Sequence, residues 1–442
     1  MKIFFLFIEV FLTSIAFAQT INKDSIAQQM KFAAKQELID KYYPRDIDTL
    51  YGGYLSTFSY DFQPVGDQEK MIVTQARHTW STAKAAMFYK DTSYISMSRH
   101  GFYFLRDKMW DKEYGGFYNL VTREGEPKTM VKQAYGNGFA IYGLTAYYEC
   151  SGDTAALNLA KKEFMWLEKH SHDPKQKGYF QYMKRDGTPI LRTADIVSTS
   201  DIGYKDQNSS IHLLEAFTEL YQVWKDPLLK ERLNEMLLLI RDKIVTPKGY
   251  LQLYFTPEWK AISYRDSSDE VIKKNHYIDH VSFGHDVETC YLMLEASEAL
   301  GNKDDAKTLA VGKKMVDHAL KNGWDNELGG FYDEGYYFKN KSGITITLES
   351  KNWWAQAEAL NTLLLLSEKF PNDPMQYYKR FTKEWQYVQT YLIDHEHGDW
   401  YDEGLDKSSE RKTALKAQIW KGSYHNFRAL MNCIKRIEGD KK

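Results

Sequence analysis

The chain of 442 residues contains only three cysteines, Cys150, Cys290 and Cys433. Three widely separated cysteines do not form a disulfide framework. Each lies in an apolar, helix-like pattern, so we read them as small buried hydrophobic residues. A nucleophilic role is disfavoured, because only Cys290 lies near the polar motifs described below.

Proline is also scarce, and neither sign of charge predominates. The chain has 10 Pro and no Ser/Gly-rich stretch, so we expect no linker and a single domain over residues 19–442. Lys and Arg total 58 against 60 Asp and Glu, giving a formal net charge of -2. That balance argues against nucleic acid or an anionic membrane surface as a partner. A hydrophobic content of 43% excludes a disordered or fibrous chain.

Long apolar runs are absent after the N-terminus. Residues 1–18 resemble a secretory signal, with a positive Lys2, an apolar stretch and the small-x-small pattern Ala16-Phe17-Ala18. Glu9 inside the apolar stretch is unfavourable. We expect cleavage after Ala18 and a secreted or periplasmic protein without membrane contact. An N-terminal anchor helix is the alternative, although the stretch is short for a span of about 20 residues.

A repeated glycine is the most informative feature that is present. A glycine followed by a strand-like, mostly aromatic run occurs six times, with spacings of 63, 62, 71, 81 and 68 residues. Each glycine ends a turn-rich stretch, where it tolerates a positive φ. The six positions are Gly53, Gly116, Gly178, Gly249, Gly330 and Gly398.

Two helical patterns per unit lie between these glycines. The helix after each glycine run is apolar on most faces, which is typical of a buried helix. The helix before the next glycine is amphipathic, as in 155–170 and 304–321, and its charged face should be exposed. Six such pairs predict an all-α fold, an (α/α)6 barrel with short β-hairpins at one end. An open α-solenoid is the alternative.

Polar residues gather at the starts of the buried helices, near positions 75, 132, 208, 284, 352 and 420, where an apolar pattern does not favour them. In a closed ring these six starts converge on one end of the axis, so we expect one shared pocket. Residues three apart share a helix face, so His212 can lie beside Glu215, and His285 beside Glu288. The candidate site residues are Arg77, Tyr135, Asn208, His212, Glu215, His285, Glu288, Trp354, Glu358, Trp420 and His425.

This set of side chains favours proton transfer next to a sugar carbonyl. Histidine both takes and gives a proton near neutral pH, and a neighbouring carboxylate fixes its tautomer. An arginine can stabilise a developing oxyanion, and tryptophan can stack on a sugar face. The 15% aromatic content fits a sugar cleft, although a tyrosine-rich core would also explain it. Nucleophile-elbow, phosphate-loop and Rossmann patterns are missing from the sequence.

A metal site is an alternative for the same residues, because two His-x-x-Glu pairs stand on separate helices. Di-iron bundles use the reverse order, Glu-x-x-His, with further carboxylates. We therefore predict no metal and no other cofactor, with a metal analysis to decide.

The motifs resemble the N-acylglucosamine 2-epimerase superfamily, and most closely its cellobiose 2-epimerase branch, from about Tyr51 to Arg436. They occur in order, each on its own buried helix. They are Arg77-x-x-Trp80, Lys132-x-x-Tyr135-x-x-x-Phe139, Asn208-x-x-x-His212-x-x-Glu215, Phe283-Gly284-His285-Asp286-Val287-Glu288, Trp353-Trp354-Ala355-Gln356-Ala357-Glu358 and Trp420-Lys421-x-x-Tyr424-His425-Asn426-x-Arg428.

The resemblance implies reversible epimerisation at C2 of a reducing-end glucose or mannose through a cis-enediolate. By the same resemblance, His285 and His425 are the acid/base pair and His212 helps to open the sugar ring. Arg77 would stabilise the enediolate oxygen. The remaining candidates would bind the sugar or orient the histidines: Tyr135, Asn208, Glu215, Glu288, Trp354, Glu358 and Trp420.

Three residues depart from the family pattern. Tyr291 stands where the family usually has Trp, and Ser423 and Phe427 replace the usual Pro and Gly. Phe427 either narrows the cleft or turns outward, so a preference for disaccharides is open.

Other readings of the function also stay open. They are an aldose–ketose isomerase of the same superfamily, a secreted glycoside hydrolase on the same toroid, and a non-catalytic sugar-binding toroid. The expected partner is a small-molecule sugar, and the expected assembly is a monomer or weak homodimer.

Overall fold

A computed structural model describes residues 23–190, 204–302 and 304–439. The expected secretory signal lies outside these residues. Among the described helices, none combines the length and apolar character that a membrane-spanning segment needs.

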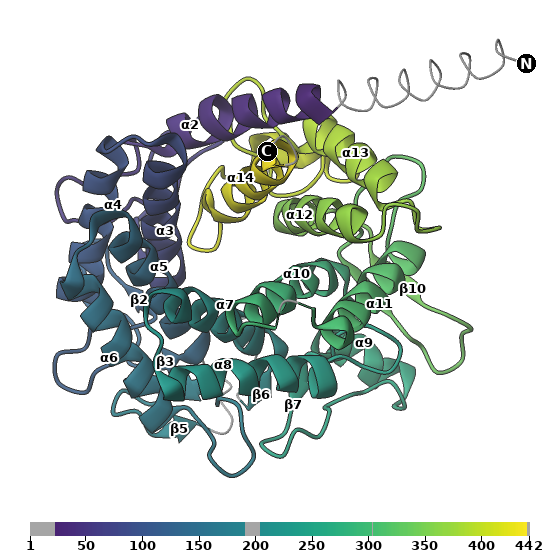
Figure 1. The fold of residues 1–442 in the computed structure, drawn as a ribbon, viewed down its shortest axis with the longest axis horizontal. Helices are drawn as coiled ribbons and strands as arrows, with labels where there is room; N and C mark the ends of the chain where they lie inside the picture. The colour runs from purple at the N-terminus through teal and green to yellow at the C-terminus, as the bar shows by residue number, and fades with distance from the viewer. Residues whose placement is uncertain (1–22, 191–203, 303, 440–442) are drawn as a thin grey trace, which may run out of the picture.

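Six helices with buried faces form the inner ring of the molecule (Figure 1). Each packs against the next, and the last packs against the first, so the ring is closed. The predicted barrel is therefore confirmed and the open solenoid is wrong. The inner helices are α3 (Ile72–Tyr89), α5 (Ala134–Ser151), α7 (Gln207–Val223), α10 (Phe283–Ala299), α12 (Trp353–Lys369) and α14 (Tyr424–Gly439).

Amphipathic helices surround this ring, each paired with one inner helix. Several end in a turn of π-helix. The outer helices are α4 (Ser93–Phe104) with η2 (Leu105–Met109), α6 (Thr154–His170), α8 (Pro227–Leu239) with η3 (Ile240–Ile244), α11 (Ala306–Asn322), and α13 (Tyr377–Tyr387) with η4 (Val388–Leu392). The two amphipathic helices predicted from sequence, 155–170 and 304–321, correspond to α6 and α11 within two residues.

The sixth outer helix comes from the N-terminus. Residues 23–32 are helical and continue into η1 (Ala33–Ile39) and α2 (Asp40–Tyr42). The η1 segment packs on α14, so the first and last helical segments of the described residues lie side by side and complete the outer ring (Figure 1). A short extra helix, α9 (Asp269–Asp279), precedes α10, and a 3-10 turn, η5 (Ser409–Thr413), precedes α14.

Short antiparallel strands lie between outer helices and the inner helices that follow, as predicted. The pairings are β1 (Lys70–Met71) with β2 (Leu120–Val121), β3 (Lys132–Gln133) with β4 (Tyr182–Met183) and β5 (Pro189–Ile190), β6 (Lys205–Asp206) with β7 (Tyr254–Phe255), and β8 (Val281–Ser282) with β9 (Glu334–Tyr336) and β10 (Thr345–Leu348). Four of these strands lead directly into α3, α5, α7 and α10, and so help to fix where the inner helices begin.

The six repeat glycines all have a φ between 67° and 92°, as the turn prediction requires. Behind five of these turns, a buried lysine binds an aspartate of the turn. The pairs are Lys70–Asp48, Lys132–Asp111, Lys205–Asp173, Lys351–Asp325 and Lys416–Asp394. In the fourth unit the aspartate position is occupied by Thr246 and the lysine position by Val281. Both charges of the pair are therefore absent from that unit.

Replacing Asp173 with alanine is expected to lower the free energy of unfolding by about 3 kcal/mol, because it leaves the buried Lys205 ammonium without its counter-ion. The double variant Asp173→Thr/Lys205→Val copies the fourth unit and should recover most of that loss. Urea unfolding followed by circular dichroism measures both. A double variant as unstable as the single one would contradict the role of the pair.

The three cysteines are free, and they lie on α5, α10 and α14 as the pattern indicated. Cys290 and Cys433 are buried, whereas Cys150 is only half-buried. Burial raises the pKa of Cys290 to about 12, which disfavours a thiolate nucleophile.

Candidate active site

A cavity of about 400 Å³ opens at the end of the ring where the inner helices begin. All six inner helices, or the residues just before them, contribute to its wall, as the sequence predicted. Nine of the eleven candidate residues line it, and Trp353 joins them. The lining residues are Arg77, Tyr135, Asn208, His212, His285, Glu288, Trp353, Trp354, Trp420 and His425.

Glu215 and Glu358, the two candidates outside the wall, lie behind histidines. Nδ1 of His212 is 2.9 Å from Oε2 of Glu215, and Nδ1 of His425 is 2.6 Å from Oε1 of Glu358. Because Nδ1 of each ring is engaged, Nε2 is the nitrogen left for a ligand. The geometry therefore favours an orienting role for these two carboxylates over direct contact with sugar hydroxyls.

His285 has a different partner from the one expected. Nδ1 of His285 is 2.8 Å from Oγ of Ser282, the residue that precedes α10. Glu288 instead accepts a hydrogen bond of 2.7 Å from Nη2 of Arg428. The expectation that His285 and Glu288 pair is wrong, because Arg428 binds the carboxylate from α14, which α12 separates from α10 in the ring. Ser282 carries no local signal that would have singled it out.

Trp354 packs near both histidines of the expected acid/base pair. The ring centroid of Trp354 is 4.6 Å from that of His285 and 5.9 Å from that of His425. The two imidazoles, 140 positions apart in the sequence, therefore line one cavity next to the same indole.

Arg428 joins three buried carboxylates, of which Glu288 lines the cavity. Nη1 of Arg428 donates to Oε1 of Glu215, and Nη2 donates to Oε1 of Glu288 at 2.7 Å and Oε1 of Glu358 at 2.6 Å. One guanidinium thus holds the carboxylates behind His212 and His425 together. The sequence placed Arg428 at the helix start but not among the site residues. The signal was an arginine in an apolar helix, three residues after His425 and on its face.

Arg77 reaches the cavity from α3. Its Nη2 donates to the Tyr135 hydroxyl at 3.1 Å, and its guanidinium lies 4.3 Å from the ring centroid of Phe139. Tyr135 in turn packs edge-on against His212, with centroids 5.2 Å apart. A fixed positive charge therefore stands in the cavity wall close to the histidines, where an oxyanion could form.

Burial sets the protonation states of this cluster. It lowers the pKa of His285 to about 3, and, with the Arg77 charge, lowers the pKa of His425 well below its usual range. It raises the pKa of Glu288 to about 8 and, with the neighbouring Glu288, raises the pKa of Glu358 well above its usual range. Burial therefore favours the neutral form of these imidazoles and of the Glu288 and Glu358 carboxyl groups.

We expect the acid limb of the kcat/KM profile to have a midpoint below pH 6.5. A neutral histidine is required as base, and burial keeps the His285 ring unprotonated at pH values where an exposed histidine would be half protonated. Initial rates between pH 4.5 and 8 measure this. A midpoint at or above 6.5 would contradict the neutral-histidine assignment.

The metal alternative has a definite location. Glu288, Glu358 and His425 each present one ligand atom, and these atoms lie within 4.8 Å of one another. Nη2 of Arg428 already binds both carboxylates, so a guanidinium supplies the positive charge there. We expect activity to survive dialysis against a chelator. A loss that one divalent ion restores would establish the metal reading instead.

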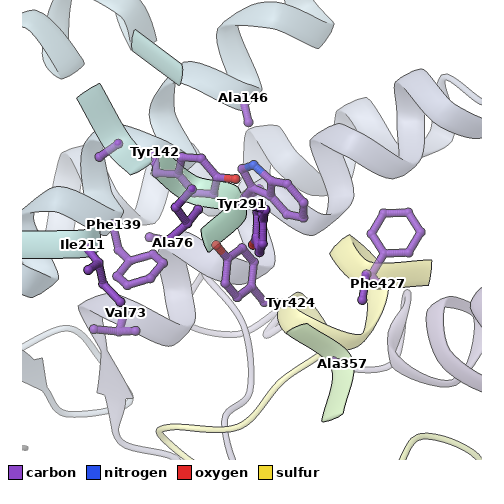
Figure 2. Packing of buried hydrophobic residues seen from close by; sticks show 14 of the residues in the cluster. Val73, Ala76, Phe139, Tyr142, Ala146, Ile211, Tyr291, Ala357, Tyr424 and Phe427 are labelled. Carbon is purple, nitrogen blue, oxygen red and sulfur yellow. The ribbon is translucent and has the colours of Figure 1, made fainter. Parts of the chain in front are cut away.

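The packing shows where two of the residues that depart from the family pattern, Phe427 and Tyr291, lie relative to the cavity. Phe427 is fully buried and turns away from the cavity, with its ring 6.1 Å from that of Tyr89. Figure 2 shows it apart from the group of Tyr142, Tyr291 and Tyr424. Tyr291 lies beneath Arg428, whose guanidinium is 5.3 Å from the Tyr291 ring centroid. Phe427 therefore does not narrow the cleft.

Comparisons with known proteins agree with this geometry. A family model for N-acylglucosamine 2-epimerase (GlcNAc 2-epimerase) matches residues 53–429. The cellobiose 2-epimerase of Bacteroides fragilis is 28% identical over 412 residues, covering 92% of this chain and 98% of that protein. The D-mannose isomerase of Marinomonas mediterranea is 22% identical over 400 residues, covering 90% and 94%.

A solved structure, that of cellobiose 2-epimerase from Bacillus thermoamylovorans, superposes with a TM-score of 0.81 at 25% identity. The superposition covers 93% of this chain and 100% of that one. Because the family model spans most of the sequence, the resemblance read from the motifs is confirmed. The chain belongs to the N-acylglucosamine 2-epimerase family, a family of carbohydrate epimerases.

Proposed function

We propose that this protein interconverts glucose and mannose at the reducing end of a β-1,4-linked disaccharide, such as cellobiose or mannobiose, by epimerisation at C2. The observation that carries the proposal is the pair of histidines, the partly buried His285 and the buried His425, which line one cavity and both pack near Trp354. Inversion at a carbon requires a proton to leave one face and to arrive at the other. The cellobiose 2-epimerase relatives support the choice of substrate.

The first step opens the sugar ring. His212 donates from Nδ1 to the carboxylate of Glu215, which leaves a lone pair on Nε2. That lone pair takes the hydrogen of the C1 hydroxyl and returns it to the ring oxygen, so the C1 aldehyde forms without a net change in protons. Glu215 keeps the imidazole in the required tautomer.

The second step removes the C2 proton. Nδ1 of His285 faces the Ser282 hydroxyl, and Nε2 of His285 acts as the base. The electron pair left by the C–H bond forms the C1–C2 double bond of a cis-enediolate, and negative charge develops on O1. The Arg77 guanidinium stabilises that charge, in a wall from which bulk water is displaced by the sugar.

The third step returns a proton to the opposite face. A protonated Glu358 donates to Nδ1 of His425, because burial favours the neutral acid. Nε2 of His425 then carries a hydrogen, which it delivers to C2 while Nδ1 takes the Glu358 proton. After product release, His285 loses its proton to solvent and Glu358 regains one. The reverse reaction uses the same groups with their roles exchanged.

An aldose–ketose isomerase is the second candidate, because it shares the enediolate and differs only in returning the proton to C1. The D-mannose isomerase relative favours it. A glycoside hydrolase fits the geometry less well. It needs two carboxyl groups flanking the scissile bond, and Glu288 and Glu358 are the candidates for that pair. Glu358, however, lies behind His425, and both carboxyl groups bind the same nitrogen of Arg428, Nη2.

Product analysis distinguishes these functions. Glucose, mannose, cellobiose and mannobiose are each incubated with the protein and resolved by chromatography and NMR. The proposal predicts glucose–mannose interconversion at the reducing end, faster on the disaccharides. A ketose would move the assignment to the isomerase, released monosaccharide to a hydrolase, and tight binding without turnover to a sugar-binding protein.

We also propose that the mature chain begins after Ala18, is exported, and forms one catalytic domain that works as a monomer or weak homodimer. The small-x-small pattern before residue 19 supports export. N-terminal sequencing and light scattering of the protein from a cell fraction outside the cytoplasm would test these points. An uncleaved N-terminus would favour the anchor alternative.

A further inference from the structure

The inner ring has one seam, where α14 packs against α3. Each other neighbouring pair of inner helices is connected through a single outer helix, whereas α3 and α14 lie near opposite ends of the chain. Arg77 stands on one side of this seam and His425 on the other. The position of Arg77 relative to His425 therefore depends on the residues that pack between α3 and α14.

Tyr43, which follows α2, bridges the seam with its hydroxyl. The hydroxyl oxygen is 2.9 Å from Nδ1 of His78 on α3 and 3.0 Å from Oγ of Ser423 before α14. His78 follows Arg77 directly, and Ser423 precedes His425 by two positions. All of these groups are buried, so the hydrogen bonds are shielded from water.

Asp46 approaches the same nitrogen of His78 as Tyr43 does. Oδ2 of Asp46, which belongs to the same N-terminal segment, is 3.1 Å from Nδ1 of His78. A side chain at Gly422 would collide with Nε2 of the His78 ring, since an added Cβ would lie 2.9 Å from it. The His78 ring is therefore enclosed between the N-terminal segment and the residues that lead into His425.

Tyr42 adds a second connection to the same stretch. Its hydroxyl donates to Oδ2 of Asp399 at 2.8 Å, and Oδ1 of Asp399 accepts from Nδ2 of Asn426 at 2.9 Å. Asn426 is the neighbour of His425. Residues 423–426 are thus held at both ends by two consecutive tyrosines of the N-terminal segment.

We infer that Tyr43 is a positioning residue for proton transfer, and that its hydroxyl sets the placement of His425 relative to Arg77. This inference rests on the proposed function, in which the enediolate oxygen meets Arg77 while C2 meets His425. Proton transfer is sensitive to misplacement of about 1 Å. Loss of the bridge should slow turnover while leaving the sugar contacts, and therefore KM, nearly unchanged.

The test compares Tyr43→Phe with Tyr147→Phe. Tyr147 is also fully buried, and its hydroxyl bonds Arg99 and Asp153 near the far end of α5, away from the cavity. Both variants lose one buried hydroxyl. Tyr43→Phe is expected to lower kcat for epimerisation and for C2 deuterium exchange by on the order of tenfold, with KM within about twofold. Tyr147→Phe should leave both rates unchanged.

A double-mutant cycle with Ser423→Ala tests whether the Tyr43 hydroxyl positions His425 through its contact with Ser423. If Tyr43 acts through Ser423, the variant Tyr43→Phe/Ser423→Ala is no slower than Tyr43→Phe alone. Independent, multiplying losses would overturn the bridge. Equal kcat in Tyr43→Phe and Tyr147→Phe would overturn the inference as a whole.

The proposed function can fail separately. If the wild-type protein shows no exchange at C2, the proposed function is refuted and the inference falls with it. Normal exchange by the wild-type protein together with equal kcat in Tyr43→Phe and Tyr147→Phe would overturn the inference alone.

Discussion

Replacing His425 with alanine is expected to lower epimerisation, and with it the formation of C2-deuterated epimer in D2O, by about 10³-fold. The imidazole is the group that delivers a proton to one face of C2, and Glu358 behind it cannot reach the cavity. A loss confined to KM would mean that His425 binds the sugar without moving the proton. Initial rates and deuterium content, measured by NMR on the same samples, separate these outcomes.

His276→Ala is the matched control for that variant. His276 lies on α9, where Nδ1 contacts only the backbone oxygen of Lys273 among the described residues, and it does not line the cavity. Its removal should leave both rates unchanged. Undiminished turnover in His425→Ala would refute the role of His425 in catalysis.

Replacing Arg428 with methionine is expected to lower the free energy of unfolding by about 3–5 kcal/mol, the largest stability loss predicted for the site. The substitution leaves Glu215, Glu288 and Glu358 buried without the guanidinium that binds all three. Urea unfolding measures the effect. Arg436→Met on the same helix is the control, since the half-exposed Arg436–Glu368 pair should contribute only about 0–1 kcal/mol.

The loss in Arg428→Met should depend on pH in a definite direction. Burial already raises the pKa of Glu288 to about 8. Loss of the Arg428 guanidinium, which donates to Oε1 of Glu288 at 2.7 Å, should raise this pKa further. A carboxyl group whose folded-state pKa is raised stabilises the fold at low pH, and this stabilisation is lost as pH rises from about 4.5 through the folded-state pKa. The deficit should therefore be larger at pH 8 than at pH 5. Adding Glu215→Gln and Glu288→Gln should recover part of it. A deficit independent of pH would contradict the buried carboxylate cluster.

The architecture and the location of the pocket were predictable because every repeat unit must meet the same physical requirement. Each unit needs a glycine with positive φ and an apolar helix that only neighbouring units can cover, so six units imply a closed ring. In a closed ring, the polar residues at the starts of the apolar inner helices must then lie at the same end of the ring. This reasoning depends on local pattern, which a single sequence contains.

Contacts between distant segments were not predictable in the same way. Glu288 shares a helix face with His285, yet Arg428 binds it from a helix 140 positions away. The extra helix α9 was missed, since the wide 81-residue spacing around it showed an insertion without showing its structure. The N-terminal segment was likewise read only as the start of the domain. Its tyrosines fill the seam through partners more than 300 positions away, and no local rule specifies such pairs.

The deciding measurement is the fate of the C2 hydrogen. Cellobiose is incubated with the wild-type protein in D2O, and both sugars are recovered and examined by proton NMR and mass spectrometry. Removal of the C2 proton by His285 and delivery of a solvent-derived one by His425 predict a mannose-type reducing end that carries one deuterium, located at C2. Inverted product that retains the original hydrogen at C2 would show that the configuration changes without a solvent-exchanging histidine, and would contradict the proposed mechanism.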